Sequence, residues 1–220
     1  MEIALEKIKR DILLYEFKPG SRLNIEDLKR RYSIGLTPIR EALNRLVSIG
    51  FAEFTGLKGF KVTQLTKDDL IDIYAARRLI EIKALALAIE KGHDLWESEI
   101  LASYHRLSKL EKDEKFIAKP DIVAWMKRYQ DFHFALLNAC QSNWLLTLDK
   151  LLFEQSERYR YLRMIKAENL IKLLEKKSKS HKKFIEYILS REKEKAIKLF
   201  SDQLDDTIND LLKTWEEGAL

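Results

Sequence analysis

Cysteine, proline and glycine are scarce in this chain of 220 residues, with one, three and seven copies. The lone Cys140 excludes an internal disulfide and a zinc site built from four cysteines, and it fits a reducing cytosol. Because proline and glycine disfavour helix interiors, long segments without either favour helices. We therefore expect a cytoplasmic, mainly α-helical protein.

Long apolar runs are also missing, and a helix needs about 20 apolar residues to cross a bilayer. The N-terminal segment MEIALEKIKRDILL mixes acidic and basic side chains, unlike a secretory signal. Hydrophobic residues make up 46% of the chain and charged residues 34%, which is the balance of a globular protein. The sequence therefore predicts no membrane association.

The excess positive charge is concentrated in the first third of the chain. Residues 1–64 hold 12 Lys and Arg against 8 Asp and Glu, whereas the remainder holds 28 against 27. A basic segment joined to a nearly neutral one suits a polyanion-binding module with a partner domain. We predict two domains, residues 1–65 and residues 66–220.

Three short helices and a hairpin are predicted in the first domain. Apolar residues have helical spacing in residues 3–16, after the N-cap Asn24, and in a segment that has Pro38 in its first turn. After Gly50 the runs FAEFTG and GFKVTQL alternate like two strands. A helix-turn-helix followed by a hairpin is a winged helix, and its third helix faces the major groove of DNA.

The outer side of the third helix has side chains that can read bases. Arg40 and Asn44 lie one turn apart, and arginine pairs with guanine while asparagine pairs with adenine. Thr37 is short enough to contact a base or a phosphate at the start of the helix. Phosphates would be held by Lys29, Arg30, Arg31, Lys58 and Lys61. A protein-docking module with the same elements is the alternative.

The run PGSRLNIEDLKRRYSIGLTPIREALNRLVSIGFAEFTGLKGFKV resembles the winged-helix domain of the GntR family of bacterial transcriptional regulators. The family pattern has Pro-Gly, a leucine, a core of the form TP-apolar-REAL-RL, and a wing that ends in Gly-x-x-Val. The matching positions are Pro19, Gly20, Leu23, Thr37, Pro38, Arg40, Glu41, Ala42, Leu43, Arg45, Leu46, Gly50, Gly59 and Val62. The resemblance adds Pro38, Arg45 and Gly59 to the expected DNA-binding set.

Two departures from the family pattern affect DNA recognition. The family commonly has Ser-Arg before its Thr-Pro, where this chain has Gly35 and Leu36. It also often has an arginine early in the second helix, where this chain has Glu26. Leu36 can touch a thymine methyl group but cannot hold a guanine, so the operator cannot be transferred from relatives.

From Thr66 to Trp215 the chain shows only helical periodicity. Six segments start near Thr66, Asp94, Pro120, Ser142, Ala167 and Arg191. Phosphate-binding loops, nucleophile elbows, dinucleotide-binding turns and HExxH motifs are absent from the sequence. We expect an all-helical bundle with ligand sites between facing helices, and no enzymatic activity.

Four polar side chains fall on apolar faces of three predicted helices: Tyr129, His133, His181 and Gln203. Buried polar groups need partners, so these residues meet one another, water or a ligand. A small-molecule pocket is one interpretation, and a satisfied core is another. An enzyme active site at the tyrosine and the two histidines is a third, but we place no carboxylate beside either histidine.

Residues 66–217 resemble the FCD effector domain of the FadR-type branch, through Tyr74-x-x-Arg77-x-x-x-Glu81, Phe132-His133 and His181. Many members bind a divalent metal through an aspartate, a histidine four residues later and two further histidines, and the metal helps hold a small carboxylate. The aspartate position is Tyr129 here, and the last histidine position is Gln203. Only His133 and His181 remain as metal ligands, whereas zinc prefers three or four. We therefore expect an effector pocket without tightly bound metal.

Arg77 is a candidate carboxylate anchor, with an intrahelical ion pair to Glu81 as the alternative. The run ERYRYLRM offers Tyr159 or Arg160 to the pocket, with solvated arginines around core aromatics as the alternative. We predict a homodimeric regulator that binds a palindromic DNA operator and a small carboxylate metabolite. A regulator whose second domain only dimerises is the rival prediction.

Overall fold

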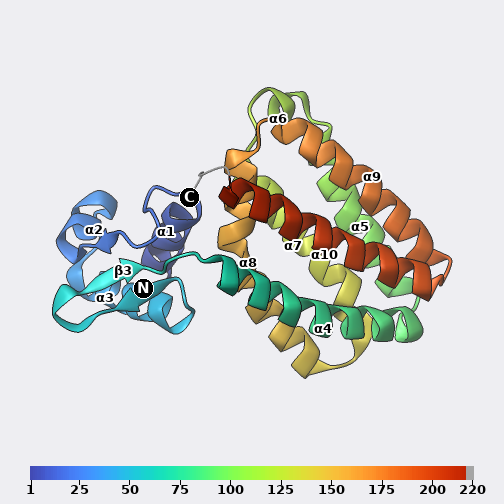
Figure 1. The fold of residues 1–220 in the computed structure, drawn as a ribbon, viewed down its shortest axis with the longest axis horizontal. Helices are drawn as coiled ribbons and strands as arrows, with labels where there is room; N and C mark the ends of the chain where they lie inside the picture. Colours follow the sequence, from blue (N-terminus) through green and yellow to red (C-terminus); the bar gives the residue numbers. More distant parts are fainter. Residues whose placement is uncertain (217–220) are drawn as a thin grey trace. The chain divides into compact units, whose positions relative to one another are not determined.

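The computed structural model describes residues 1–216, which are mainly helical and divide into two compact units (Figure 1). The first unit comprises Met1–Ile71 and Glu154–Leu162, and the second comprises Asp72–Phe153 and the described chain from Arg163. The boundary predicted between residues 65 and 66 lies between the last strand and the helix that follows it.

The first unit has the predicted winged-helix elements. Its helices and strands are α1 (Glu2–Leu13), β1 (Arg22–Leu23), α2 (Ile25–Tyr32), α3 (Leu36–Ser48), β2 (Ala52–Phe54) and β3 (Phe60–Val62). The sheet is antiparallel in the order β1-β3-β2. The predicted hairpin, β2 and β3, is therefore present. Strand β1 was not predicted, because two residues have no measurable periodicity.

Local sequence explains where these elements begin and turn. The Asn24 side chain accepts hydrogen bonds from the backbone N–H groups of Glu26 and Asp27, so the predicted N-cap of α2 is confirmed. Helix α3 buries Ile39 and Leu43 completely, which fixes its inward face and leaves the opposite face exposed. Gly59 has φ +75°, a conformation that glycine adopts without strain at the turn of the wing.

The remaining chain forms helices that make up the second unit, apart from the first turn of α4 and the Glu154–Leu162 segment of α8, which belong to the first. They are α4 (Lys67–Lys91), α5 (Asp94–Glu111), α6 (Glu114–Ala118), α7 (Ile122–Leu137), α8 (Asn143–Lys166), α9 (Leu170–Leu189) and α10 (Lys193–Glu216). Helix α5 packs against α7 and α9, and α9 packs against α10 (Figure 1). Helix α6 was not predicted because five residues are too few for a periodic signal. None of the helices among residues 1–216 combines the length and the apolar character that a membrane span requires.

An aromatic cluster between α7 and α9 surrounds His181, which is 4% exposed. Its ring lies 5.8 Å from the Tyr129 ring and 5.2 Å from the Phe132 ring, measured between centroids. Burial, together with the charge of Lys177, lowers the pKa of His181 to about 3. His181 is therefore neutral in the folded protein near neutral pH.

This buried histidine makes folding stability depend on pH. As pH falls below the ordinary histidine pKa of about 6.5, the unfolded chain binds the proton while folded His181 does not, so stability falls by up to about 1.4 kcal/mol per pH unit. Between pH 6.5 and 5, we expect the wild type to lose about 1.5 kcal/mol more unfolding free energy than His181→Phe. Urea unfolding at both pH values measures this difference.

The matched control is His105→Phe, because His105 is exposed on α5. This variant should show the same pH dependence as the wild type. An equal loss of stability in His181→Phe and the wild type would contradict the neutral buried histidine.

Candidate nucleic-acid interface and buried polar cluster

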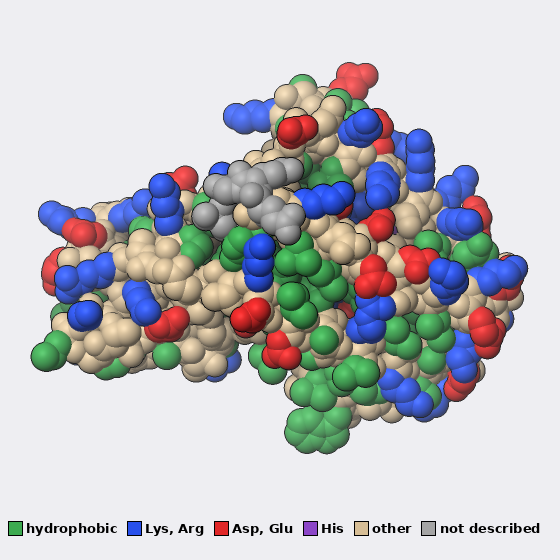
Figure 2. Space-filling model, viewed as in Figure 1, with side chains coloured by type: hydrophobic (Ala, Val, Ile, Leu, Met, Phe, Trp, Pro, Cys, Tyr) green, Lys and Arg blue, Asp and Glu red, His purple; other side chains and the backbone are tan. Residues whose placement is uncertain are grey.

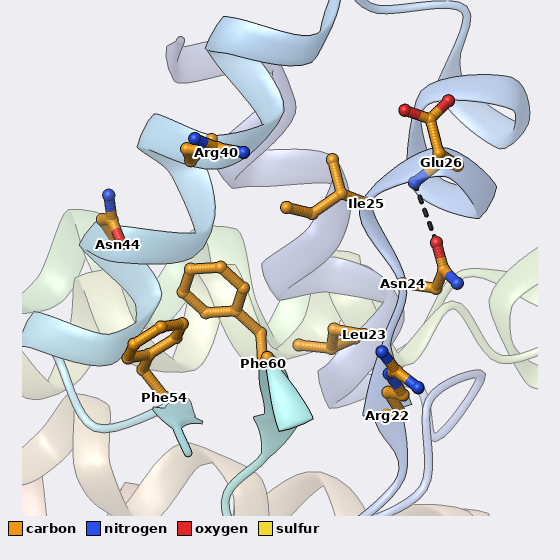
Figure 3. Close-up of a pocket in the computed structure, with 10 residues that line it drawn as sticks. Arg22, Leu23, Asn24, Ile25, Glu26, Arg40, Asn44, Phe54 and Phe60 are labelled. Carbon is orange, nitrogen blue, oxygen red and sulfur yellow. Dashed lines mark hydrogen bonds between the residues drawn. The ribbon is translucent and has the colours of Figure 1, made fainter. Parts of the chain in front are cut away.

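A groove of about 460 Å³ opens between α2, α3 and the wing (Figure 3). Its lining residues are Arg22, Leu23, Asn24, Ile25, Glu26, Arg40, Asn44, Phe54, Gly59 and Phe60. Arg40 and Asn44, the predicted base-reading residues, both project from the exposed face of α3 at this groove. The fold thus places a guanine-pairing and an adenine-pairing side chain one helical turn apart on an accessible surface.

Seven of the ten lining residues were not among the predicted DNA-binding residues, and Arg22 and Phe54 are two of them. Arg22 is exposed on the short strand β1. Phe54 is 59% exposed, and its ring centroid lies 5.0 Å from that of Phe60. Phe54 was interpreted only as a strand former, and its position next to the glycine-rich turn was the available sign of exposure. Together they add a positive charge and an apolar surface to the groove.

Glu26 brings a negative charge to the same groove. It is exposed, and its Oε2 lies 3.2 Å from Nζ of Lys29. A carboxylate repels phosphate, but it accepts a hydrogen bond from the amino group of cytosine. Glu26, which stands where the family often has an arginine, therefore lies in the same groove as the predicted base-reading residues.

The predicted phosphate-binding residues of α2 form exposed ion pairs. Lys29 pairs with Glu26, Arg30 with Asp27, and Arg31 with Asp11 and Glu16. Such exposed pairs contribute little stability, typically below about 1 kcal/mol. Their partners can therefore be exchanged for phosphate at low cost.

The wing presents the remaining predicted phosphate ligands. Lys58 is exposed at the end of the 3-10 turn Gly56–Lys58, and Lys61 on β3 lies 2.8 Å from Glu53. On α3, Thr37 and Arg45 are exposed and Pro38 is half-buried. DNA contact by these residues, and by Gly59, remains a prediction.

In the second unit, Arg77 and Glu81 form a buried ion pair on α4. Arg77 Nε donates to Glu81 Oε1 over 2.5 Å, and the two side chains are 2% and 0% exposed. The Arg77 guanidinium also lies over the rings of Tyr74 and Phe153, at 4.9 Å and 5.3 Å. The intrahelical ion pair that the sequence offered as an alternative is thus present, and both of its side chains are buried.

His133 on α7 lies beside two buried carboxylates. Its Nε2 is 3.1 Å from Asp149 Oδ1 and 4.0 Å from Glu81 Oε1. The expectation that no carboxylate lies beside either histidine was therefore wrong for His133. Asp149 comes from α8, where it is the one acidic residue in the apolar run NWLLTLDKLLF, and that isolated charge was a usable signal.

The charge of Asp149 follows from these neighbours. Burial raises the pKa of Asp149, but the His133 charge, the His133 hydrogen bond and Arg77 lower it by more, so the net pKa lies below its ordinary value. Asp149 is therefore ionised. Glu81, His133 and Asp149 each offer one potential metal-ligand atom, and these atoms lie within 4.8 Å of one another.

The other predicted effector residues are only partly brought together. Tyr129 lies near both histidines, with ring centroids 6.5 Å from His133 and 5.8 Å from His181. Gln203 is half-buried on α10, and its Nε2 donates to Ser180 Oγ over 2.8 Å.

Tyr159 and Arg160 belong to the first unit. The Tyr159 hydroxyl donates to Asp69 Oδ2 over 2.5 Å, and Arg160 donates to Ser156. The structure therefore does not bring these two residues into the cluster around His133. The alternative of solvated arginines in ERYRYLRM is wrong, because Arg158, Arg160 and Arg163 are all buried.

Two family models match the chain. The model described as "Bacterial regulatory proteins, gntR family" matches residues 2–62, and the FCD domain model matches residues 72–206. The two matched segments are separated by the loop after β3 and the first turn of α4. One model therefore covers the winged helix and the other covers the helices that follow it.

Individual proteins that are similar to this chain are also transcriptional regulators. The HTH-type transcriptional repressor GlaR of Escherichia coli (strain K12) is 34% identical over 197 residues, which cover 90% of this chain and 89% of GlaR. The uncharacterized HTH-type transcriptional regulator BphR of Paraburkholderia xenovorans (strain LB400) is 38% identical over 164 residues, covering 74% and 66%.

Solved structures share the fold. E. coli McbR/YncC aligns with a TM-score of 0.77 at 22% identity, covering 96% of both chains. A putative transcriptional regulator GntR from Rhodococcus sp. RHA1 aligns with a TM-score of 0.73 at 17% identity, covering 96% of this chain and 97% of that chain. The matched families and relatives are transcriptional regulators and not enzymes. With a winged helix over residues 2–62 followed by an FCD domain over residues 72–206, this chain belongs to the GntR family of bacterial transcriptional regulators.

Proposed function

We propose that this protein is a cytoplasmic, homodimeric repressor whose affinity for a palindromic operator is controlled by a small carboxylate metabolite. The observation that carries the DNA-binding part is the exposed groove with Arg40 and Asn44 on α3. The name of the relative GlaR, a repressor, supports the direction of regulation. The carboxylate, of which dicarboxylates are the first candidates, is inferred from the FCD domain.

The polar interior of the second unit supports an effector site. A helical bundle that only dimerises needs no ionised groups in its core, and buried charges are costly unless they are paired. This core holds Arg77, Glu81, His133 and Asp149, with the neutral His181 close to Tyr129. Arginine is well suited to bind a carboxylate, since its planar guanidinium matches the geometry of that group.

Control of DNA binding by such a site is a matter of coupled equilibria. An effector that binds one arrangement of the two DNA-reading domains more tightly than another shifts the population toward the first. The coupling works equally in both directions, so operator DNA must change effector affinity by the same factor. No change in the groove itself is required.

An exposed apolar face is the surface we assign to the second copy. On α8, Trp144 is 77% exposed, Leu148 39% and Leu151 49%, at positions that share one side of the helix. Leu79 on α4 is 75% exposed. Figure 2 shows hydrophobic side chains gathered over α4 and the start of α8. Apolar patches of this kind mark interaction surfaces, and a palindromic operator needs a two-fold symmetric dimer.

Charge on this face should therefore separate the subunits. We expect the double variant Leu148→Asp with Leu151→Asp to be monomeric by light scattering at concentrations where the wild type is dimeric. Leu57→Asp is the control, because Leu57 is fully exposed on the wing of the first unit. A double variant that remains dimeric would refute the assigned interface.

We expect different effects from substituting a predicted base-reading residue and a predicted phosphate-binding residue. The probe is the duplex that the wild type selects from a random DNA library. Arg40→Ala should weaken binding by about 1–3 kcal/mol and relax the base preference at one position of each half-site. Lys58→Ala should weaken binding to all sequences and reduce the slope of log affinity against log salt by about 0.9.

Arg106→Ala is the control for lost charge, since Arg106 is exposed on α5 in the second unit. This variant should bind the selected duplex like the wild type. If the protein selects no duplex and its DNA affinity is independent of salt, the protein-docking alternative replaces DNA binding.

The effector is tested by thermal melting against a panel of small mono- and dicarboxylates. A ligand at 100 times its Kd stabilises the folded state by about 2.7 kcal/mol through mass action. We expect one class of carboxylate to raise the melting temperature and to weaken operator binding. If no carboxylate does so, the rival prediction of a purely dimerising domain replaces the effector site.

A further inference from the structure

We propose that a divalent transition-metal ion binds between α4, α7 and α8, with Glu81, His133 and Asp149 as its protein ligands. Each residue comes from a different helix, and each offers one ligand atom. The site does not depend on the identity of the effector or on DNA binding.

The spacing of the ligand atoms is close to what one ion requires. Metal–nitrogen and metal–oxygen bonds of about 2.0–2.2 Å place two ligand atoms of the same ion about 3–3.5 Å apart. His133 Nε2 is 3.1 Å from Asp149 Oδ1 and 4.0 Å from Glu81 Oε1. All three atoms lie within 4.8 Å of one another, so side-chain rotation must bring them closer before they share one ion.

Each of the two carboxylates has one oxygen that can still bind a ligand. Both side chains are 0% exposed, and neither Glu81 Oε2 nor Asp149 Oδ2 has a hydrogen-bond partner among residues 1–216. Buried oxygens of this kind are costly to leave unpaired. Both atoms belong to side chains directed toward His133, so a ligand between the helices can satisfy them.

Charge at the site favours a cation over an anion. Arg77 offsets the charge of Glu81 through their ion pair, and Asp149 adds a second buried carboxylate. Metal ligands must be deprotonated, so we expect metal affinity to fall as pH falls.

The donor set indicates which ions are suitable. One imidazole and two carboxylates suit borderline first-row ions such as Zn²⁺, Mn²⁺ and Fe²⁺. Magnesium and calcium prefer oxygen donors alone, and copper(I) prefers thiolate and thioether ligands. Zinc and manganese are therefore the probes of choice.

This set differs from the ligand positions of the family, of which it keeps only His133. At those positions Tyr129 replaces an aspartate, and Gln203, whose amide donates to Ser180, replaces a histidine. The family positions therefore do not fit a metal in this chain. The expectation of no tightly bound metal rested on those positions, and Asp149 supplies the missing carboxylate from another helix.

The test is calorimetric titration of the full-length protein, stripped with a chelator, with zinc chloride and manganese chloride at pH 7.5. We expect one ion per chain. Asp149→Asn and His133→Gln should each weaken binding at least about 10-fold, because even the loss of a residue that only orients a ligand costs that much. His105→Gln, at an exposed histidine, is the matched control and should bind like the wild type, and His181→Gln tests the family positions. Circular dichroism verifies the fold of each variant.

X-ray absorption of the zinc-loaded wild type gives a readout that needs no variant. A shell of nitrogen and oxygen with one imidazole supports the proposed site. Two imidazoles, or loss of binding in His181→Gln with binding kept in Asp149→Asn, would place the ion at the family positions and overturn the proposal. Absence of metal binding to the wild type would also overturn it.

Discussion

Two carboxylates that must be neutralised inside a helical core constrain the second unit more than any other feature. Glu81 and Asp149 are fully buried and lie beside the same imidazole nitrogen of His133. Arg77 balances one of them from the preceding turn of α4. Removing any member leaves a buried charge without its partner, at a cost of about 3–5 kcal/mol. The relative positions of α4, α7 and α8 are therefore tied to this cluster.

In the first unit, by contrast, the side chains predicted to contact DNA are exposed to solvent. The core of α3 is fully buried through Ile39 and Leu43, while Arg40 and Asn44 on the outer face are exposed. Exposed polar side chains can exchange water for base edges, so the proposed base contacts do not require buried groups to be exposed. Glu26 adds a negative charge to this surface, which favours selection against some sequences over general affinity for phosphate.

Elements with long periodic patterns could be predicted from the sequence. The three helices of the winged helix, its hairpin and the Asn24 cap follow from apolar spacing and from local hydrogen-bonding chemistry. The long helices of the second unit have the same origin. Strand β1 and helix α6 have two and five residues, so neither contains a full period of its own pattern.

Side-chain partners between helices could not be predicted in the same way. Periodicity placed His133 on an inward face, but it does not say which residue of another helix stands opposite. Asp149 is 16 residues away and on a different helix, so only the packing of α7 against α8 reveals the pair. The same limitation applies to Arg158 and Arg160, whose charge suggested solvent although their side chains are buried.

Coupling between the two functional surfaces is the central claim, and it can be measured directly. Operator affinity would be determined by fluorescence anisotropy with and without a saturating carboxylate that stabilises the protein. We expect operator affinity to change at least about 5-fold, and carboxylate affinity to change by the same factor when operator is present. Identical operator affinities with the ligand site empty and filled would contradict it.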